Sequence, residues 1–400
     1  MLTDGTLGED AQPSHDAVAF TGTRSELFGR LLRGYLLMLP TLGVYRFWVT
    51  TTKRRFYWQN TVVAGEPLEY TGNARQLLIG FLFAVAFFLP IYVAFFVFST
   101  QSGTFALVGY GCVAALLWLL TGYAQYRGRD FRLSRTLWRG IRFDQKGSAW
   151  GYAWRRFGWS LLVLVTLGLT YPLMVGNLWR YRYNNTWYGN RQVTFAGSWK
   201  TIAGPFYRAY GVVAVTVAAA IGLNIAARGG GGWIGISLLA VLLVAGLVFP
   251  YWRSREASRM LSAIRLGDVA VSVHVRARTL VGQYTVFGLA LFGVLVALML
   301  VGTMLFMQLY LTHQIDPVGD FRQLAMSGWA GATLVIGGYL VGFASFSLLA
   351  ETILDFGYWK AVASRATLSN VESLAAIRAI DEDQALVGEG LADALNVGSF

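Results

Sequence analysis

Apolar runs constrain the fold of this chain more than any other feature, because a run of about 20 residues crosses a bilayer as a helix. Hydrophobic residues make up 55% of the chain and charged residues only 14%. This composition predicts an all-α, polytopic transmembrane bundle rather than a soluble protein with a few buried helices. The runs lie near residues 27–49, 76–98, 105–124, 157–178, 206–226, 233–252, 280–308 and 328–350.

The chain also contains an internal duplication with an offset of 125 residues. Thr41-Leu42-Gly43 recurs as Thr166-Leu167-Gly168. A register that is kept over many positions indicates a repeated structural unit. The same offset relates further pairs: Arg55 and Arg180, Asn60-Thr61 and Asn185-Thr186, and Tyr70-x-Gly72 and Phe195-x-Gly197.

Charge is strongly segregated along the sequence. Residues 1–23 carry four acids and no Lys or Arg, and residues 366–400 carry six acids and one base. The part between these tails therefore holds 32 of the 33 Lys and Arg residues and 11 of the 21 acids. Basic residues beside apolar segments are typical of cytoplasmic loops. This pattern predicts three helical hairpins, at 76–124, 206–252 and 280–350, and argues against a nucleic-acid partner.

The two motif segments, 27–49 and 157–178, do not fit as simple spans. Segment 157–178 has arginines at both ends, so both ends favour the cytoplasm. We therefore expect six full spans and two broken or re-entrant segments, with bends at Pro40–Gly43 and Thr166–Gly168. Gly and Pro permit such bends. Eight full spans with an inverted second repeat are the alternative.

These patterns divide the chain into five parts. The first is an acidic tail, and the last is an acidic cytoplasmic tail. A capping pattern at Ser369–Glu372 predicts a short helix at the start of this last part. Between them lie two membrane repeats and a membrane hairpin. The ranges are 1–23, 24–148, 149–275, 276–365 and 366–400.

Within the first repeat, residues 129–143 fit an amphipathic helix at the membrane interface. On a helical wheel, apolar and aromatic side chains fill one arc and arginines the opposite arc. Such a helix contacts anionic lipid headgroups, either as a specific contact or as a plain anchor. The arginines are Arg129, Arg132, Arg135, Arg139 and Arg142.

Two further groups of residues are candidates for function. Glu351 and Asp355 stand four apart near one end of the last span, and intramembrane acids often couple protons or cations. Arg30 and Arg33 are their candidate partners, or they face water. A second set is kept in both repeats, and its arginines suit phosphate or carboxylate groups. It comprises Arg55, Asn60, Arg180 and Asn185. In the alternative interpretation, the arginines only extend their charge to the membrane surface and the asparagines only end helices.

No catalytic constellation appears in the sequence, so we do not expect an enzyme. The three histidines, His15, His274 and His313, lack the spacing of metal ligands. Neither a metal nor a cofactor is expected.

The run Thr-Leu-Gly-x-Tyr-x-x-Trp at 41–48 is followed by basic residues, aromatics, Asn60-Thr61 and Tyr70-x-Gly72. In this run, in Phe20-x-Gly22 and in Tyr358-Trp359-Lys360, the chain resembles the YjgN-like family of bacterial inner-membrane proteins. The second copy departs from the pattern, with Tyr171-Pro172 after its Thr-Leu-Gly. The resemblance implies a multi-pass inner-membrane location, and it brings no activity or catalytic residues.

Two functions fit these observations. The duplication, the broken segments and the acids favour a transporter or channel for a small solute, ion or lipid. The alternative is a non-catalytic protein that organises the membrane or binds a partner or lipid. In both cases we expect a C-terminus in the cytoplasm and anionic lipid headgroups as partners, and the oligomeric state is left open, a homo-oligomer included.

Overall fold

The structure, a computed structural model, describes residues 18–100, 103–227, 231–313 and 329–379. Within these residues, six helices are long and apolar enough to cross a membrane. This confirms the predicted helical membrane fold with six full spans. They are α3 (Ala74–Ser99), α4 (Thr104–Ser134), α7 (Trp199–Ala226), α8 (Gly231–Leu261), α9 (Ala277–His313) and a last span made of α11 (Trp329–Leu349), a π-helical turn (Ala350–Asp355) and α12 (Phe356–Ala363).

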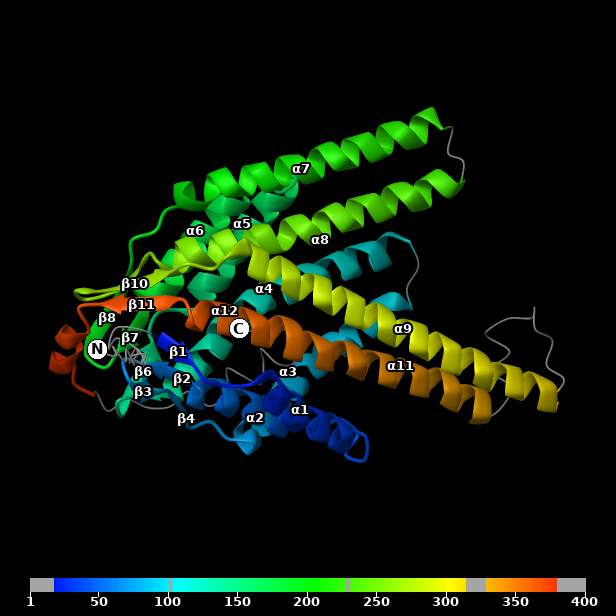
Figure 1. Ribbon diagram of the computed structural model, residues 1–400. Coiled ribbons are helices and arrows are strands. Elements are labelled where there is room, and N and C mark those ends of the chain that lie inside the picture. Colours follow the sequence, from blue (N-terminus) through cyan, green and yellow to red (C-terminus); the bar gives the residue numbers. More distant parts are fainter. Residues whose placement is uncertain (1–17, 101–102, 228–230, 314–328, 380–400) are drawn as a thin grey trace, which may run out of the picture.

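A β-sheet at one end of the helices is absent from the sequence-based prediction (Figure 1). Eight antiparallel strands follow the order β11-β10-β9-β8-β7-β6-β5-β4, and β1-β2-β3 form a second sheet. Only Leu68 separates β3 from β4, and β1 lies against β11, so the strands together form a ring. The strand ring comprises β1 (Val18–Phe20), β2 (Thr61–Val63), β3 (Glu66–Pro67), β4 (Glu69–Tyr70), β5 (Thr136–Trp138), β6 (Ile141–Gln145), β7 (Thr186–Tyr188), β8 (Arg191–Phe195), β9 (Ile264–Leu266), β10 (Val269–Val273) and β11 (Ala366–Ser369).

Every helical hairpin is inserted between two strands that pair with each other. Phe20 of β1 pairs with Thr61 of β2, and the hairpin between them leaves the ring and returns to it. The same holds for the four other hairpins. The flanking pairs are Tyr70 and Thr136, Gln145 and Thr186, Phe195 and Ile264, and Val273 and Ala366.

Two of the five hairpins are short, and they are the predicted broken segments. The first consists of α1 (Arg24–Met38) and α2 (Arg46–Gln59), and the second of α5 (Ala149–Val165) and α6 (Tyr171–Asn184). At 1.5 Å per residue, these helices of 14 to 17 residues reach only about 21 to 26 Å, less than the hydrocarbon thickness of about 30 Å. Since both ends return to the strand ring, the structure supports the broken segments and not eight full spans.

The Thr-Leu-Gly motif makes the bend in both short hairpins. Leu42 and Gly43 adopt left-handed φ values of 48° and 84°, and Leu167 and Gly168 repeat this with 51° and 97°. Thr41 Oγ1 donates to Leu37 O at 2.7 Å and accepts from the N–H of Tyr45. These bonds end one helix and prepare the next. Because a non-glycine residue rarely adopts positive φ, the shared conformation confirms that the two segments are copies.

The duplication extends to whole elements. Adding 125 residues to the bounds of α2 gives those of α6, and the same shift converts β2 into β7. Asn60 and Asn185 both donate from Nδ2 to the carbonyl four residues earlier, at 2.8 and 2.7 Å. The predicted internal duplication is confirmed.

The interior of the strand ring is a packed core. Trp138 of β5, Tyr188 of β7 and Val269 of β10 are buried together. The Tyr188 hydroxyl donates to Trp138 O at 2.9 Å, and burial raises the pKa of this phenol, so it keeps its proton. Leu374 and Ile377 fill the same core from the end of the described chain.

The region expected as an acidic tail therefore begins inside the fold. Its first residues form β11, in which Ser369 pairs with Ala270. Because pairing extends Ser369, the expected helix cap does not form; Asn370 turns the chain with φ 59°, and a 3-10 helix covers Val371–Ala376. Residues 380–400 of this tail, and most of the N-terminal one, lie outside the described residues.

The predicted amphipathic helix over 129–143 is wrong. Helix α4 ends at Ser134, and β5 and β6 follow as a hairpin. Arg139 and Gly140 form its two-residue turn with φ values of 52° and 70°, the left-handed pair that joins twisted antiparallel strands. The arginines therefore do not share one face toward lipid. Arg135 is only 1% exposed.

Candidate functional site

Glu351 and Asp355 meet a lysine that the sequence analysis did not connect with them. Lys53 Nζ of α2 lies 2.8 Å from Glu351 Oε1 and 3.9 Å from Asp355 Oδ2. The side chains are 14%, 21% and 31% exposed, respectively. We call these three residues the acid–lysine cluster. It joins the first short hairpin to the last span, across 298 positions of sequence.

The two acids lie where the last span departs from regular α-helical geometry. They lie in the π-helical turn Ala350–Asp355, in which the backbone bonds skip one residue more than in an α-helix. Such turns inside helices are frequent at functional sites. Tyr35 of α1 and Ser347 of α11 border the same cluster, so three helices enclose the acids.

The charges of the cluster do not balance. One ammonium group faces two carboxylates, so the cluster carries one excess negative charge when all three groups are ionised. Glu351 Oε2 is buried and makes no hydrogen bond within the described residues. A buried charge without a partner is costly. The cluster can therefore take up one proton or one small monovalent cation.

The arginines expected as partners of these acids lie elsewhere. Arg30 donates to Glu26 Oε1 at 2.6 Å and lies over the ring of Phe56. Arg33 is exposed and forms no ion pair with either acid. Lys53 stands in the basic run of the first motif, and nothing in its local pattern distinguishes it from its neighbours.

The residues kept in both repeats have roles within the fold. Arg55 Nη2 donates to Gly72 O at 3.1 Å and to Asn73 Oδ1 at 2.9 Å, and Arg180 Nη2 donates to Gly197 O at 3.2 Å. Each arginine thus ties a short hairpin to the start of the following long one. Their contact with an anion stays a prediction.

The arginines of the region 129–143 are held by protein groups rather than by a shared lipid face. Arg129 donates from Nη1 to Gln145 and to Thr186 Oγ1. Arg135 stacks on Phe131, with its guanidinium carbon 3.7 Å from the ring centre. Arg139 pairs with Glu66 Oε1 at 3.1 Å. Arg132 and Arg142 are half-buried.

Comparison with known proteins identifies relatives of the chain. The model of the family described as "Bacterial protein of unknown function (DUF898)" matches residues 15–233. The chain is 29% identical over 166 residues to the inner membrane protein YjgN of Escherichia coli strain K12, and 28% identical over 165 residues to that of Escherichia coli O157:H7.

Each alignment covers 41% of this chain and 39% of the relative, so the match spans well under half of the relatives' length. No solved structure matches the chain. Together with the six apolar helices, the relatives support a multi-pass inner-membrane location. By the family match, which extends over more than half of its length, the chain belongs to the bacterial DUF898 family.

Proposed function

We propose that the protein is a membrane transporter or channel for a small solute or ion, in which the acid–lysine cluster binds a proton or monovalent cation. The observation that carries this proposal is the excess negative charge of Lys53, Glu351 and Asp355 at the contact of two hairpins. Neutralising this charge strengthens the contact between α2 and the last span. A bound cation thereby favours one arrangement of the two hairpins over another.

The cluster occurs in only one of the two repeats. The position that corresponds to Lys53 in the second short hairpin is Leu178, a buried apolar residue. Glu351 and Asp355 lie in the last hairpin, beyond both repeats. Within the described residues there is therefore one such site, and the asymmetry assigns different roles to the two short hairpins.

Proton and cation movement tests this proposal. Proteoliposomes that contain the full chain are assayed for H⁺ entry with trapped pyranine and for uptake of ²²Na⁺ and ⁸⁶Rb⁺. We expect at least one of these ions to cross faster than in protein-free liposomes, and Glu351→Gln to reduce that rate to the protein-free value. The amide retains the shape of the side chain and removes its charge.

Glu26→Gln is the matched control, because Glu26 also pairs with a base but lies on an exposed face of α1. It should conduct like the wild-type protein. The proposal fails if none of the three ions crosses faster than in protein-free liposomes, or if Glu351→Gln conducts as fast as the wild type.

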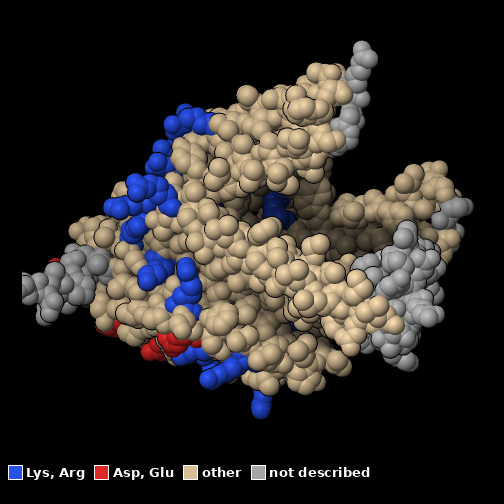
Figure 2. Space-filling view, turned by 45° about the vertical axis from the view of Figure 1, so that its right-hand side comes forward, with Lys and Arg blue, Asp and Glu red and all other residues tan. Residues whose placement is uncertain are grey.

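We further propose that the strand ring faces the cytoplasm. Figure 2 shows Lys and Arg side chains gathered around the sheet end of the molecule, whereas the far ends of the helices carry almost none on this face. Basic residues remain on the cytoplasmic side of bacterial membranes.

Labelling of single cysteines in intact cells checks this orientation. In a Cys112→Ala background, Thr104→Cys at the start of α4 should react with a membrane-impermeant maleimide. Asp268→Cys, in the turn between β9 and β10, should react only after lysis. The reverse pattern would place the strand ring outside.

A further inference from the structure

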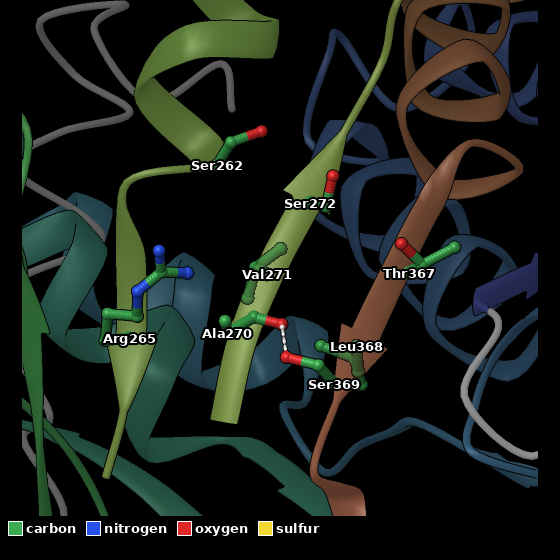
Figure 3. Close-up of a pocket in the computed structure, with 8 residues that line it drawn as sticks. All are labelled: Ser262, Arg265, Ala270, Val271, Ser272, Thr367, Leu368 and Ser369. Carbon is green, nitrogen blue, oxygen red and sulfur yellow. Dashed lines mark hydrogen bonds between the residues drawn. The ribbon is translucent and has the colours of Figure 1, made fainter. Parts of the chain in front are cut away.

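A pocket lies on the outer face of the strand ring, and no residue of the acid–lysine cluster lines it. Its volume is about 330 Å³, at the lower end of the range of small-molecule sites. Figure 3 shows that three consecutive strands and the residue after α8 form it. The lining residues are Ser262, Arg265, Ala270, Val271, Ser272, Thr367, Leu368 and Ser369.

Strand register brings the polar side chains of this pocket to one face. Ala270 of β10 pairs with Arg265 of β9 on one side and with Ser369 of β11 on the other, and Ser272 pairs with Thr367. Directly paired residues point to the same face of a sheet. The alternate residues of β10, among them Val269 and Val273, are buried on the opposite face. The outer face therefore combines one guanidinium group with three hydroxyls.

Ala270 leaves the space between these groups open. Figure 3 shows the Arg265 side chain reaching from β9 toward β10, and the side chains of Thr367 and Ser369 on the far side of β10. A methyl group at the centre of the row fills little of the gap. A larger side chain there would occupy the pocket, so residue 270 controls whether a ligand fits.

The polar groups are available to a ligand. The side chain of Arg265 forms no ion pair or hydrogen bond within the described residues, and the residue is half-buried. Ser369 Oγ donates to Ala270 O, and Ser272 Oγ lies near His274 Nδ1, both at 3.4 Å. Bonds of that length are weak, so these hydroxyls can turn toward a ligand. Asp268 is exposed in the turn that follows β9.

We propose that this pocket binds a phosphate group. A guanidinium group pairs with two oxygens of a phosphate at once, and the Ser and Thr hydroxyls add single donors from the other side. The pocket begins at Ser262, directly after α8, and β10 leads into α9 through His274. It thus lies where membrane helices end, within reach of both a phospholipid headgroup and a free phosphate.

Binding of two probes to the full chain in detergent tests the pocket and distinguishes these sources. Inorganic phosphate is titrated by calorimetry, and retention of phosphatidylglycerol against diacylglycerol, which lacks the phosphate, is measured by native mass spectrometry. We expect binding of at least one of the two phosphate-bearing probes, inorganic phosphate or phosphatidylglycerol. Arg265→Gln should weaken it about tenfold, as loss of one charged hydrogen-bonding group does. Binding of phosphate alone identifies a soluble ligand, and selective retention of phosphatidylglycerol identifies a lipid.

Two further variants distinguish binding in this pocket from general attraction of anions to positive charge. Ala270→Leu fills the space without changing charge and should weaken binding as much as Arg265→Gln does. Arg191→Gln removes an exposed charge on the neighbouring β8, outside the pocket, and should leave binding unchanged. The proposal is overturned if the two arginine variants lose binding equally, or if Ala270→Leu binds like the wild type. It is also overturned if neither phosphate-bearing probe binds. This inference is independent of ion transport.

Discussion

Gly189→Ala is expected to release the segment Val371–Arg378 from the strand ring. Gly189 has φ 51°, and a Cβ there would collide with the Arg378 carbonyl oxygen. That oxygen accepts the Asn190 N–H at 3.1 Å, and Asn190 Oδ1 accepts the Arg378 N–H at 3.2 Å. Both bonds must break to make room. Leu374 and Ile377 then leave the core, at a cost of about 1.5–3 kcal/mol each.

Hydrogen–deuterium exchange of peptides from residues 371–378 measures this release. Exchange should accelerate strongly in Gly189→Ala and remain slow in Gly140→Ala. Gly140 also has positive φ, at 70°, but an added Cβ there meets no atom within 4 Å. The control therefore carries the backbone strain, about 1–2 kcal/mol, without the collision. Equal acceleration in both variants would show that strain, and not the Arg378 contact, holds the segment.

Lys53→Met is expected to be the most destabilising single change in the acid–lysine cluster. It removes the one cation that pairs with Glu351 and Asp355 among the described residues, and it leaves two half-buried carboxylates close together. Loss of one partner of a buried ion pair costs about 3–5 kcal/mol, and partial exposure of these groups favours the lower end. Thermal unfolding in detergent at neutral pH should show a clearly lower midpoint.

The triple variant Lys53→Met, Glu351→Gln and Asp355→Asn should recover most of the lost stability, because it removes the charges together and preserves their shapes. Lys360→Met is the control on the last span, since Lys360 is exposed and forms no ion pair within the part of the chain that the structure describes. If the triple variant is no more stable than Lys53→Met, the lysine acts through packing rather than through charge.

The membrane part of this fold could be predicted from sequence because its signals are local. Six long spans follow from run length, and the two short hairpins follow from basic flanks beside Thr-Leu-Gly. Pro40 and Gly43 mark the bend directly. The repeat strengthened these predictions, since the second copy kept the same bend at Gly168.

The strand ring was missed because its strands have only two to five residues. Such strands carry few alternations, and in the region 129–143 a helical period fits the same residues. The overlooked signal is a two-residue turn with glycine, in Ala64-Gly65, Arg139-Gly140, Gly189-Asn190 and Gly267-Asp268. These pairs recur after each of the first four helical hairpins and indicate β-hairpins.

The candidate site was predicted only in part. The spacing of Glu351 and Asp355 placed them together, but no local pattern identifies Lys53 as their partner. The same limit applies to Arg135, which the sequence pattern predicts to face lipid, whereas in the fold it lies against Phe131. Partners that are distant in sequence are set by the closure of the strand ring, which no single segment encodes.

The insertion of every helical hairpin between paired strands restricts how such a chain can change in evolution. Each insert must cross the membrane an even number of times, or not at all, because the next strand has to return to its partner on the same side. Gain or loss of a single crossing would place the following strands on the opposite side of the bilayer from their pairing partners. Relatives of this chain should therefore differ in length by whole hairpins, added or lost as pairs of helices.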